Sequence, residues 1–412
     1  MNRINNNIYW RIAILILLVS SMVSPFISLN YRGYVGLIPL LAISLFLVFS
    51  GKRGDFIINS IYNSYKLNRT MFLSLILFIV GVAFTFLRGA SDYQYFISIT
   101  VLPIFFLIGI FLSKNQLYKD FAITSILLFI SMNILLTGQT IGVNESARQI
   151  YSDSNHDLSA GASRFWALIG IFFPLFIYLV IKQKTVFKKC IYALPLLFIV
   201  YKLFFSGFAT PIALLLINLL VIGAVYLFNN MKNFKAFFKA SFIFLALVTL
   251  TVFLFNILLE SNIGSMEAVQ WRFNNFIENP SGGGYDDSSL GVSRFELMKF
   301  SWDTFVDNIM FGGGGNIRTS IYEGISGGHS SAIDLLAVMG IAGGGGAFLF
   351  FILKGFKNSF RLMKYKNDFY TICNFSVVVS MIIGGIMNPY WSGPILMCYL
   401  LVVNIYKLDY NG

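Results

Sequence analysis

Charged residues and cysteine are both scarce in this chain of 412 residues. Only 12% of the residues are Asp, Glu, Lys or Arg, whereas a soluble domain contains roughly a quarter. The three cysteines are Cys190, Cys373 and Cys398, and all of them fall in or near apolar segments. We therefore expect neither a disulfide framework nor a thiolate metal site.

Apolar residues dominate instead, at 57% of the chain, with a mean hydropathy of +0.74. They form runs of about 17–25 residues, the length that crosses a bilayer as a helix. Twelve such runs can be placed, at roughly 10–29, 34–50, 71–87, 95–112, 121–138, 163–181, 189–205, 208–228, 237–259, 331–353, 369–387 and 391–407. The sequence predicts an all-α, polytopic integral membrane protein of 11–13 spans, forming one domain over residues 1–412, without a cleavable signal peptide.

The loops differ sharply in charge. If the N-terminus is cytoplasmic, the cytoplasmic side holds 21 of the 30 Lys and Arg residues and 4 of the 18 acids. Because positive charge marks cytoplasmic loops, both termini are predicted to be cytoplasmic. The net charge of +12 then reflects topology, and we expect no nucleic-acid partner.

Three loops are longer than the rest. Residues 52–70 form either an interfacial amphipathic helix or a plain cytoplasmic loop. Residues 139–162 form an outer loop, in which His156 with Asp153 and Asp157 is weak evidence for a metal. Residues 260–330 form the largest outer loop, and its many aromatic side chains favour a folded cap.

One helix can be predicted inside the largest loop. Ser293 is a good N-cap, and Glu296 three residues later completes a capping box. An apolar stripe then follows at helical spacing, and the glycines 312–315 end the helix. The stripe consists of Met298, Trp302, Phe305, Val306 and Ile309. A phosphate-binding role for these glycines is disfavoured, because the lysine of a nucleotide loop is missing.

Arginine is concentrated on the predicted outer side, which has seven arginines and two lysines against five and sixteen on the cytoplasmic side. Arginine is preferred where a planar donor must meet phosphate or carboxylate. A lipid phosphate or diphosphate is the natural anion at a membrane, although pairing with the outer acids is the alternative. Arg294 stands in the first turn of its predicted helix, where the helix dipole disfavours a cation unless an anion is bound there.

The second candidate residue is His329, which lies directly before the apolar segment from Ala332 to Leu353. Ser330 or Ser331 can cap that helix, and its positive end favours the uncharged imidazole. Such an imidazole can accept a proton from an attacking sugar hydroxyl, and Gly328 leaves room for a substrate. A loop histidine without a task is the alternative.

Three segments resemble the outer-loop signature of the O-antigen polymerase and ligase superfamily. They are GVSRFELMK from Gly291, DNIMFGGGGN from Asp307, and HSSAIDLLAVMGIAG from His329. The family pattern has an arginine that begins a loop helix, then a glycine-rich segment, then a histidine before a late membrane helix. Met310 departs from it, since proline is common there.

The resemblance implies a GT-C-type inverting glycosyltransferase of the bacterial inner membrane, without metal or cofactor, whose site faces the periplasm. Donor and acceptor would be undecaprenyl-diphosphate-linked glycans, and a membrane protein that regulates chain length would be a further partner. Arg294 would contact the donor diphosphate, and His329 would deprotonate the acceptor hydroxyl. Further phosphate contacts would come from Arg272, Arg164, Arg148 and Arg318.

Two alternatives to a polymerase stay open. An O-antigen ligase uses the same donor and passes the glycan to lipid A-core. A transporter of lipid-linked sugars would instead place charged residues at bilayer depth along a pathway, and the predicted spans carry almost none in their middles.

Overall fold

The computed structural model describes residues 6–21, 54–87, 99–137, 156–206, 208–229, 234–260, 294–314, 330–391 and 393–407. Every regular element in these ranges is a helix, which confirms the predicted all-α class for the described part of the chain. The elements are α1 (Asn6–Ser21), α4 (Gly54–Leu87), α6 (Leu102–Ser113), α7 (Gln116–Thr137), α9 (His156–Lys182), α10 (Val186–Phe204), α11 (Ala209–Asn229), α12 (Phe234–Glu260), α14 (Arg294–Asp307), α15 (Ser331–Met339), η3 (Ile341–Gly345), α16 (Gly346–Lys366), α17 (Phe369–Met387) and α18 (Gly393–Val402).

Five of the described helices contain a stretch long and apolar enough to cross a membrane. These stretches are Asn68–Thr85, Gln116–Leu135, Arg164–Lys182, Ala209–Asn229 and Phe369–Met387. Shorter apolar helices cover Ile8–Ser20, Leu102–Ser113, Phe237–Thr249 and Gly393–Val402. The protein therefore has the helices of an α-helical membrane protein. The predicted span 34–50 lies outside the described residues.

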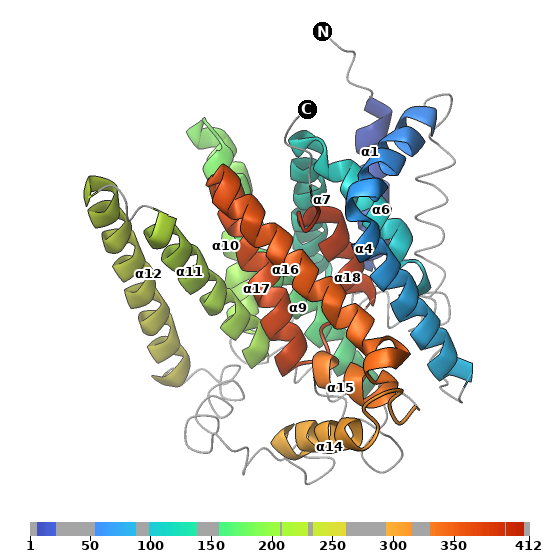
Figure 1. The fold of residues 1–412 in the computed structure, drawn as a ribbon. Coiled ribbons are helices and arrows are strands. Elements are labelled where there is room, and N and C mark those ends of the chain that lie inside the picture. The colour runs from blue at the N-terminus through green and yellow to red at the C-terminus, as the bar shows by residue number, and fades with distance from the viewer. Residues whose placement is uncertain are drawn as a thin grey trace.

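The long helices run side by side as a bundle, and α14 lies across one end of it (Figure 1). Helix α9 is central, because it packs against α7, α10, α11 and α17. Helix α12 stands at the edge of the bundle against α11 (Figure 1). The buried residues of these helices form one continuous apolar core.

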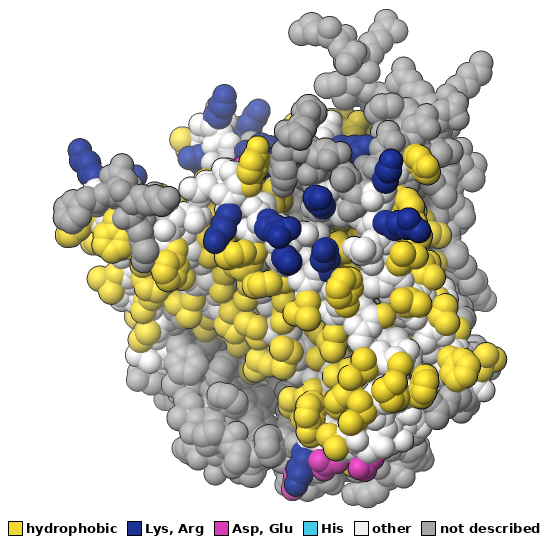
Figure 2. Space-filling view, in the orientation of Figure 1, with side chains coloured by type: hydrophobic (Ala, Val, Ile, Leu, Met, Phe, Trp, Pro, Cys, Tyr) yellow, Lys and Arg dark blue, Asp and Glu magenta, His cyan; other side chains and the backbone are white. Residues whose placement is uncertain are grey.

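Charge is segregated between the two ends of the bundle (Figure 2). One end, called the lysine-rich end below, carries Lys182, Lys184, Lys188, Lys189, Lys364 and Lys366. The opposite end, called the α14 end, carries the exposed acids Glu296, Asp303 and Asp307 together with one exposed lysine of α14, Lys299. A band of apolar side chains separates the two ends on the face shown in Figure 2. This is the charge pattern on which the predicted topology depends.

The last predicted span, 391–407, is not one helix. Helix α18 ends at Val402, and residues 403–406 are buried without helical structure. Buried non-helical backbone requires polar partners within the protein, because its N–H and C=O groups do not reach water. Side chains from distant helices supply these partners, as the contacts below show.

Three asparagine side chains form hydrogen bonds with the backbone of this final segment. Asn374 accepts a hydrogen bond from the Asn404 amide (2.6 Å) and donates to the Asn404 carbonyl (3.1 Å). Asn358 donates to the Ile405 carbonyl (2.9 Å). Asn68 accepts from the Lys407 amide and donates to its carbonyl (2.9 and 3.1 Å).

The carbonyl end of α18 also has a side-chain partner. The side-chain nitrogen of Lys119, which is fully buried, donates to the carbonyl of Leu401 (2.7 Å) and lies 5.5 Å from the ring centre of Tyr406. The last carbonyls of a helix have no hydrogen-bond partners within the helix. Lys119 therefore helps to end α18 inside the bundle.

Two loop predictions can be compared with the structure. Residues 54–67 are helical and belong to α4, which bends at Asn68 (φ −111°, ψ 16°), so this part of the segment 52–70 is a helix, and its position in a membrane interface stays a prediction. Helix α9 begins at His156, inside the range predicted as the loop 139–162. Helical backbone therefore extends beyond the apolar stretch that begins at Arg164, and the outer position of residues 139–162 stays a prediction.

Candidate functional site at the junction of α14 and α15

The structure places two of the predicted site residues. Arg294 begins α14, as predicted, and Arg164 is half-buried on α9. Because Lys182 at the other end of α9 belongs to the lysine-rich end, Arg164 lies toward the α14 end. His329, Arg272, Arg148 and Arg318 lie outside the described residues, although His329 directly precedes the described Ser330.

Helix α15 begins as the sequence predicts. The Ser330 hydroxyl caps it by accepting a hydrogen bond from the amide of Ile333 (3.4 Å). Ser330 is completely buried. The residue that follows His329 is therefore held firmly at the start of a helix.

A buried carboxylate joins the two helices. Asp334, in the first turn of α15, is 1% exposed. It accepts hydrogen bonds from the Ser301 hydroxyl of α14 (2.6 Å) and from the Ser330 amide (2.9 Å). A buried carboxylate is costly unless such donors surround it. This bridge between Ser301 and Asp334 was not predicted, although a single acid at the start of an apolar segment signalled it.

The face of α14 that packs on the protein differs from the predicted stripe. Leu297, Ser301 and Phe305 are buried at a spacing of four residues, whereas Trp302 and Val306 are about half exposed. Of the predicted stripe, Phe305 packs on the protein, whereas Trp302, Val306 and Ile309 form a separate, exposed apolar flank. The polar Ser301 takes a core position since Asp334 of α15 provides its acceptor.

Glycines form the joint between the end of α14 and the broken helix after α15. The amides of Gly313 and Gly314 donate to the carbonyls of Ala337 and Val338 (2.8 and 3.0 Å). These carbonyls belong to the last turn of α15, which has no helical donors of its own for them. Gly312 has φ +65°, and a Cβ there would collide with the Val338 backbone.

A second pair of hydrogen bonds joins the same two segments, with donors and acceptors exchanged. The amides of Ile341 and Ala342 donate to the carbonyls of Ile309 and Met310 (2.9 and 2.8 Å). Gly340 (φ +62°) and Gly344 (φ +119°) interrupt the helix here, so the predicted span 331–353 consists of α15, the π-helical turn η3 and the start of α16.

The start of α15 is also tied to the rest of the bundle. The amide and hydroxyl of Ser331 lie 3.4 and 3.3 Å from the carbonyl oxygen of Asn388, and the Trp391 amide donates to the Ser331 hydroxyl (3.0 Å). The Asn388 side chain reaches Thr210 of α11 (3.0 Å). Sequence reasoning did not predict these contacts.

The junction therefore joins the two described helices α14 and α15 into one packed unit. Helix α14, which Arg294 begins, packs against α15, whose cap directly follows His329. The amino end of a helix attracts anions, and the junction lies at the end opposite the lysine-rich end (Figure 1). Among the described residues, no group of three His, Cys, Asp or Glu side chains could hold a metal ion. The expected independence from metal stays a prediction.

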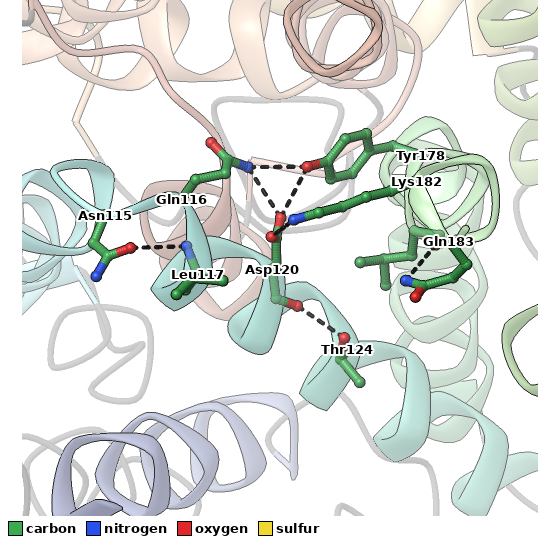
Figure 3. A network of polar contacts seen from close by, with 9 residues as sticks. Asn115, Gln116, Leu117, Asp120, Thr124, Tyr178, Lys182 and Gln183 are labelled. Atoms are coloured by element: carbon green, nitrogen blue, oxygen red, sulfur yellow. Dashed lines mark hydrogen bonds and ion pairs between the residues drawn. The ribbon is translucent and has the colours of Figure 1, made fainter. Parts of the chain in front are cut away.

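A separate polar network lies at the lysine-rich end (Figure 3). Asp120 of α7 pairs with the ammonium of Lys182 of α9, and it accepts hydrogen bonds from Tyr178 (3.1 Å) and Gln116 (3.0 Å). Since this network joins the ends of α7 and α9 away from α14, it does not belong to the candidate site.

No protein-family model matches this chain, and no curated protein is similar enough to count as a relative. The resemblance to O-antigen polymerases and ligases therefore depends on the residues themselves.

Proposed function

We propose that this chain polymerises undecaprenyl-diphosphate-linked oligosaccharide repeat units into O-antigen or a related surface polysaccharide. In this proposal it is a metal-independent, inverting glycosyltransferase of the bacterial inner membrane. The growing glycan would leave its lipid carrier and join the end of a newly delivered lipid-linked repeat unit.

One observation carries the proposal. The loop helix that begins at Arg294 packs against α15, and the Ser301–Asp334 bridge connects them just after His329. An arginine for the diphosphate and a histidine for the acceptor hydroxyl need this kind of common support, because reacting groups must be held in one geometry. The charge segregation of the bundle supports a site on the non-cytoplasmic side.

The proposed reaction exchanges one bond for another. The acceptor hydroxyl attacks the anomeric carbon as the bond from that carbon to the donor diphosphate breaks. His329 takes the hydroxyl proton, and undecaprenyl diphosphate leaves with the electron pair of the broken bond. Arg294 stabilises the charge that develops on the leaving group. Such electrostatic stabilisation of the transition state is usually the largest single contribution to catalysis.

The proposal also includes a membrane topology, with more spans than the five candidate spans and with an orientation. With about twelve spans in a GT-C-like arrangement, both termini are cytoplasmic and the α14 end faces the periplasm. Arg164, Arg272, Arg148 and Arg318 would then share a compartment with Arg294. Those that approach the diphosphate would add positive charge around the leaving group.

Deletion of the gene in its host tests the function directly. A polymerase deletion leaves surface glycan of core plus a single repeat unit on a gel. Bare core with accumulated lipid-linked polymer would instead identify a ligase. An unchanged glycan ladder would contradict both enzymes and favour a transporter or another role.

Complementation of that deletion tests the two catalytic residues. His329→Ala and Arg294→Ala are expected to abolish the ladder at wild-type membrane abundance. The matched controls are His156→Ala, which removes the only other histidine, and Arg361→Ala, which removes an exposed arginine of α16. A wild-type ladder from either test variant would remove that residue from the mechanism.

A further inference from the structure

One flank of α14 and the turn after it expose large apolar side chains. Trp302 is 50% exposed, Val306 49%, Met310 58% and Phe311 62%. Ile309 belongs to the same group at 46%. Such a concentration in a single segment of a folded protein marks an interaction surface.

The helix also has a polar flank. Lys299, Asp303 and Asp307 are exposed on it, while Leu297 and Ser301 face the protein. Helix α14 therefore has three sides: one packed on α15, one apolar and one charged. A helix with an apolar and a charged flank is the form that lies in a membrane interface.

The apolar flank continues directly into the membrane-facing side of α4. A Cβ on Gly343 would lie 3.3 Å from the carbonyl oxygen of Phe311, and a Cβ on Gly81 of α4 would collide with the carbonyl of Gly343. Phe311 therefore contacts η3, and η3 in turn contacts α4. Beside Gly81, α4 exposes Val80 and Phe84 at 57% and 64%.

These two residues belong to a longer stripe on α4 that also includes Leu73, Ile76, Leu77 and Leu87. The stripe follows helical spacing along a candidate membrane span, Asn68–Thr85, and extends just beyond it. This side of α4 would face lipid if the span crosses a bilayer, and η3 lies between α4 and Phe311 at the end of the α14 flank.

The position of α14 suits an interface. The helix lies across the end of the bundle rather than along it (Figure 1). The backbone joint from Ile309 to Gly314 fixes its height relative to α15 and η3. Tryptophan is enriched at the level of lipid headgroups, and Trp302 lies there if α4 crosses the bilayer.

We propose that α14 is an interfacial helix whose flank from Trp302 to Phe311 lies in the lipid bilayer. Its occupant is the acyl and headgroup boundary of the leaflet at the α14 end. Asp303 and Asp307 stay in water. This proposal does not require the glycosyltransferase function, so either can fail alone.

Spin-label accessibility in vesicles tests the proposal. The labels are placed by Val306→Cys, Met310→Cys, Asp303→Cys and Asp307→Cys in the full-length chain carrying Cys190→Ser. That background removes the exposed cysteine, while Cys373 and Cys398 are buried. The purified protein is reconstituted into phosphatidylcholine and phosphatidylglycerol vesicles.

The measured quantity is collision with oxygen relative to collision with a water-soluble nickel chelate. We expect this ratio to be several-fold higher at Val306 and Met310 than at Asp303 and Asp307. Phe84→Cys gives the lipid-facing reference. All five labels replace exposed side chains, and size-exclusion chromatography with label mobility verifies the fold.

Two results would overturn the proposal. Ratios at Val306 and Met310 as low as those at Asp303 and Asp307 would place the apolar flank in water. Exclusion of both oxygen and nickel at Val306 and Met310 would show that protein covers the flank, either a second copy or another chain. Chemical crosslinking would then separate those two occupants.

Discussion

Removal of the Asp334 carboxylate should loosen α14 from the bundle. Asp334→Ala deletes the acceptor for the Ser301 hydroxyl and for the Ser330 amide. Ser301 also lies 3.3 Å from the Leu297 carbonyl, so its hydroxyl keeps a second acceptor. Two losses lower the stability. The charge-assisted hydrogen bond from Ser301 to the carboxylate is lost, and the buried amide of Ser330 loses the carboxylate as its acceptor.

These two costs set the expected magnitude. Hydrogen bonds to charged groups contribute about 1.5–3 kcal/mol, and a buried unsatisfied donor costs about 1–3 kcal/mol. Partial relaxation reduces the sum, so we expect the free energy for opening α14 to fall by about 2–3 kcal/mol. At about 1.36 kcal/mol for each tenfold change, amide exchange in α14 should accelerate roughly 30- to 150-fold.

Hydrogen exchange measured by mass spectrometry on the purified chain provides the assay. Peptides over residues 297–307 should exchange faster in Asp334→Ala, while peptides of α9 stay unchanged. Asp303→Ala, on the exposed flank of the same helix, is the matched control. The double variant with Ser301→Ala should open little more easily than Asp334→Ala alone, because both changes remove one interaction. Unchanged exchange in α14 of Asp334→Ala would refute the reasoning.

Two further variants probe the parts that position the junction. Gly312→Ala should lower the melting temperature and the yield of folded protein, because φ +65° disfavours alanine and its Cβ meets the α15 backbone. Gly355→Ala is its control, since a Cβ there lies at ordinary contact distance, 3.4 Å, from the nearest atom; similar losses in both would contradict the prediction. Asn374→Ala should destabilise the protein by about 2–4 kcal/mol, because both backbone groups of Asn404 lose a buried partner. Asn308→Ala, which replaces an exposed side chain, is the control. Equal melting temperatures for the two variants would show that the hydrogen bonds between Asn374 and Asn404 add no stability.

The sequence predicts the helical class and most helix positions well. The length of the apolar runs is sufficient to locate α7, α9, α11 and α17. A segment that crosses lipid must satisfy its own backbone hydrogen bonds, and a helix does so without distant partners. The start of α14 at Arg294 and the cap at Ser330 were also predicted. Such caps are local, since the side chain and the amide that it accepts from lie within one turn.

The broken helices could not be predicted in the same way. Residues 403–407 belong to the last apolar run but are not helical. Asparagine side chains on α4, α16 and α17 form hydrogen bonds with their backbone instead. These partners lie from 30 to 339 residues away in the sequence. Likewise Ser301 acquires its buried position only from Asp334, 33 residues later. Tertiary contacts, rather than local propensity, decide these features.

Polymerisation by the purified chain tests the central proposal most directly. The full-length protein, reconstituted into vesicles, is given the undecaprenyl-diphosphate-linked repeat unit extracted from its host. The account predicts a ladder of longer lipid-linked glycans, with free undecaprenyl diphosphate released at each step. The ladder should persist in EDTA and with His156→Ala and should vanish with His329→Ala. An unchanged single repeat unit, with folded protein verified by size-exclusion chromatography, would contradict the account.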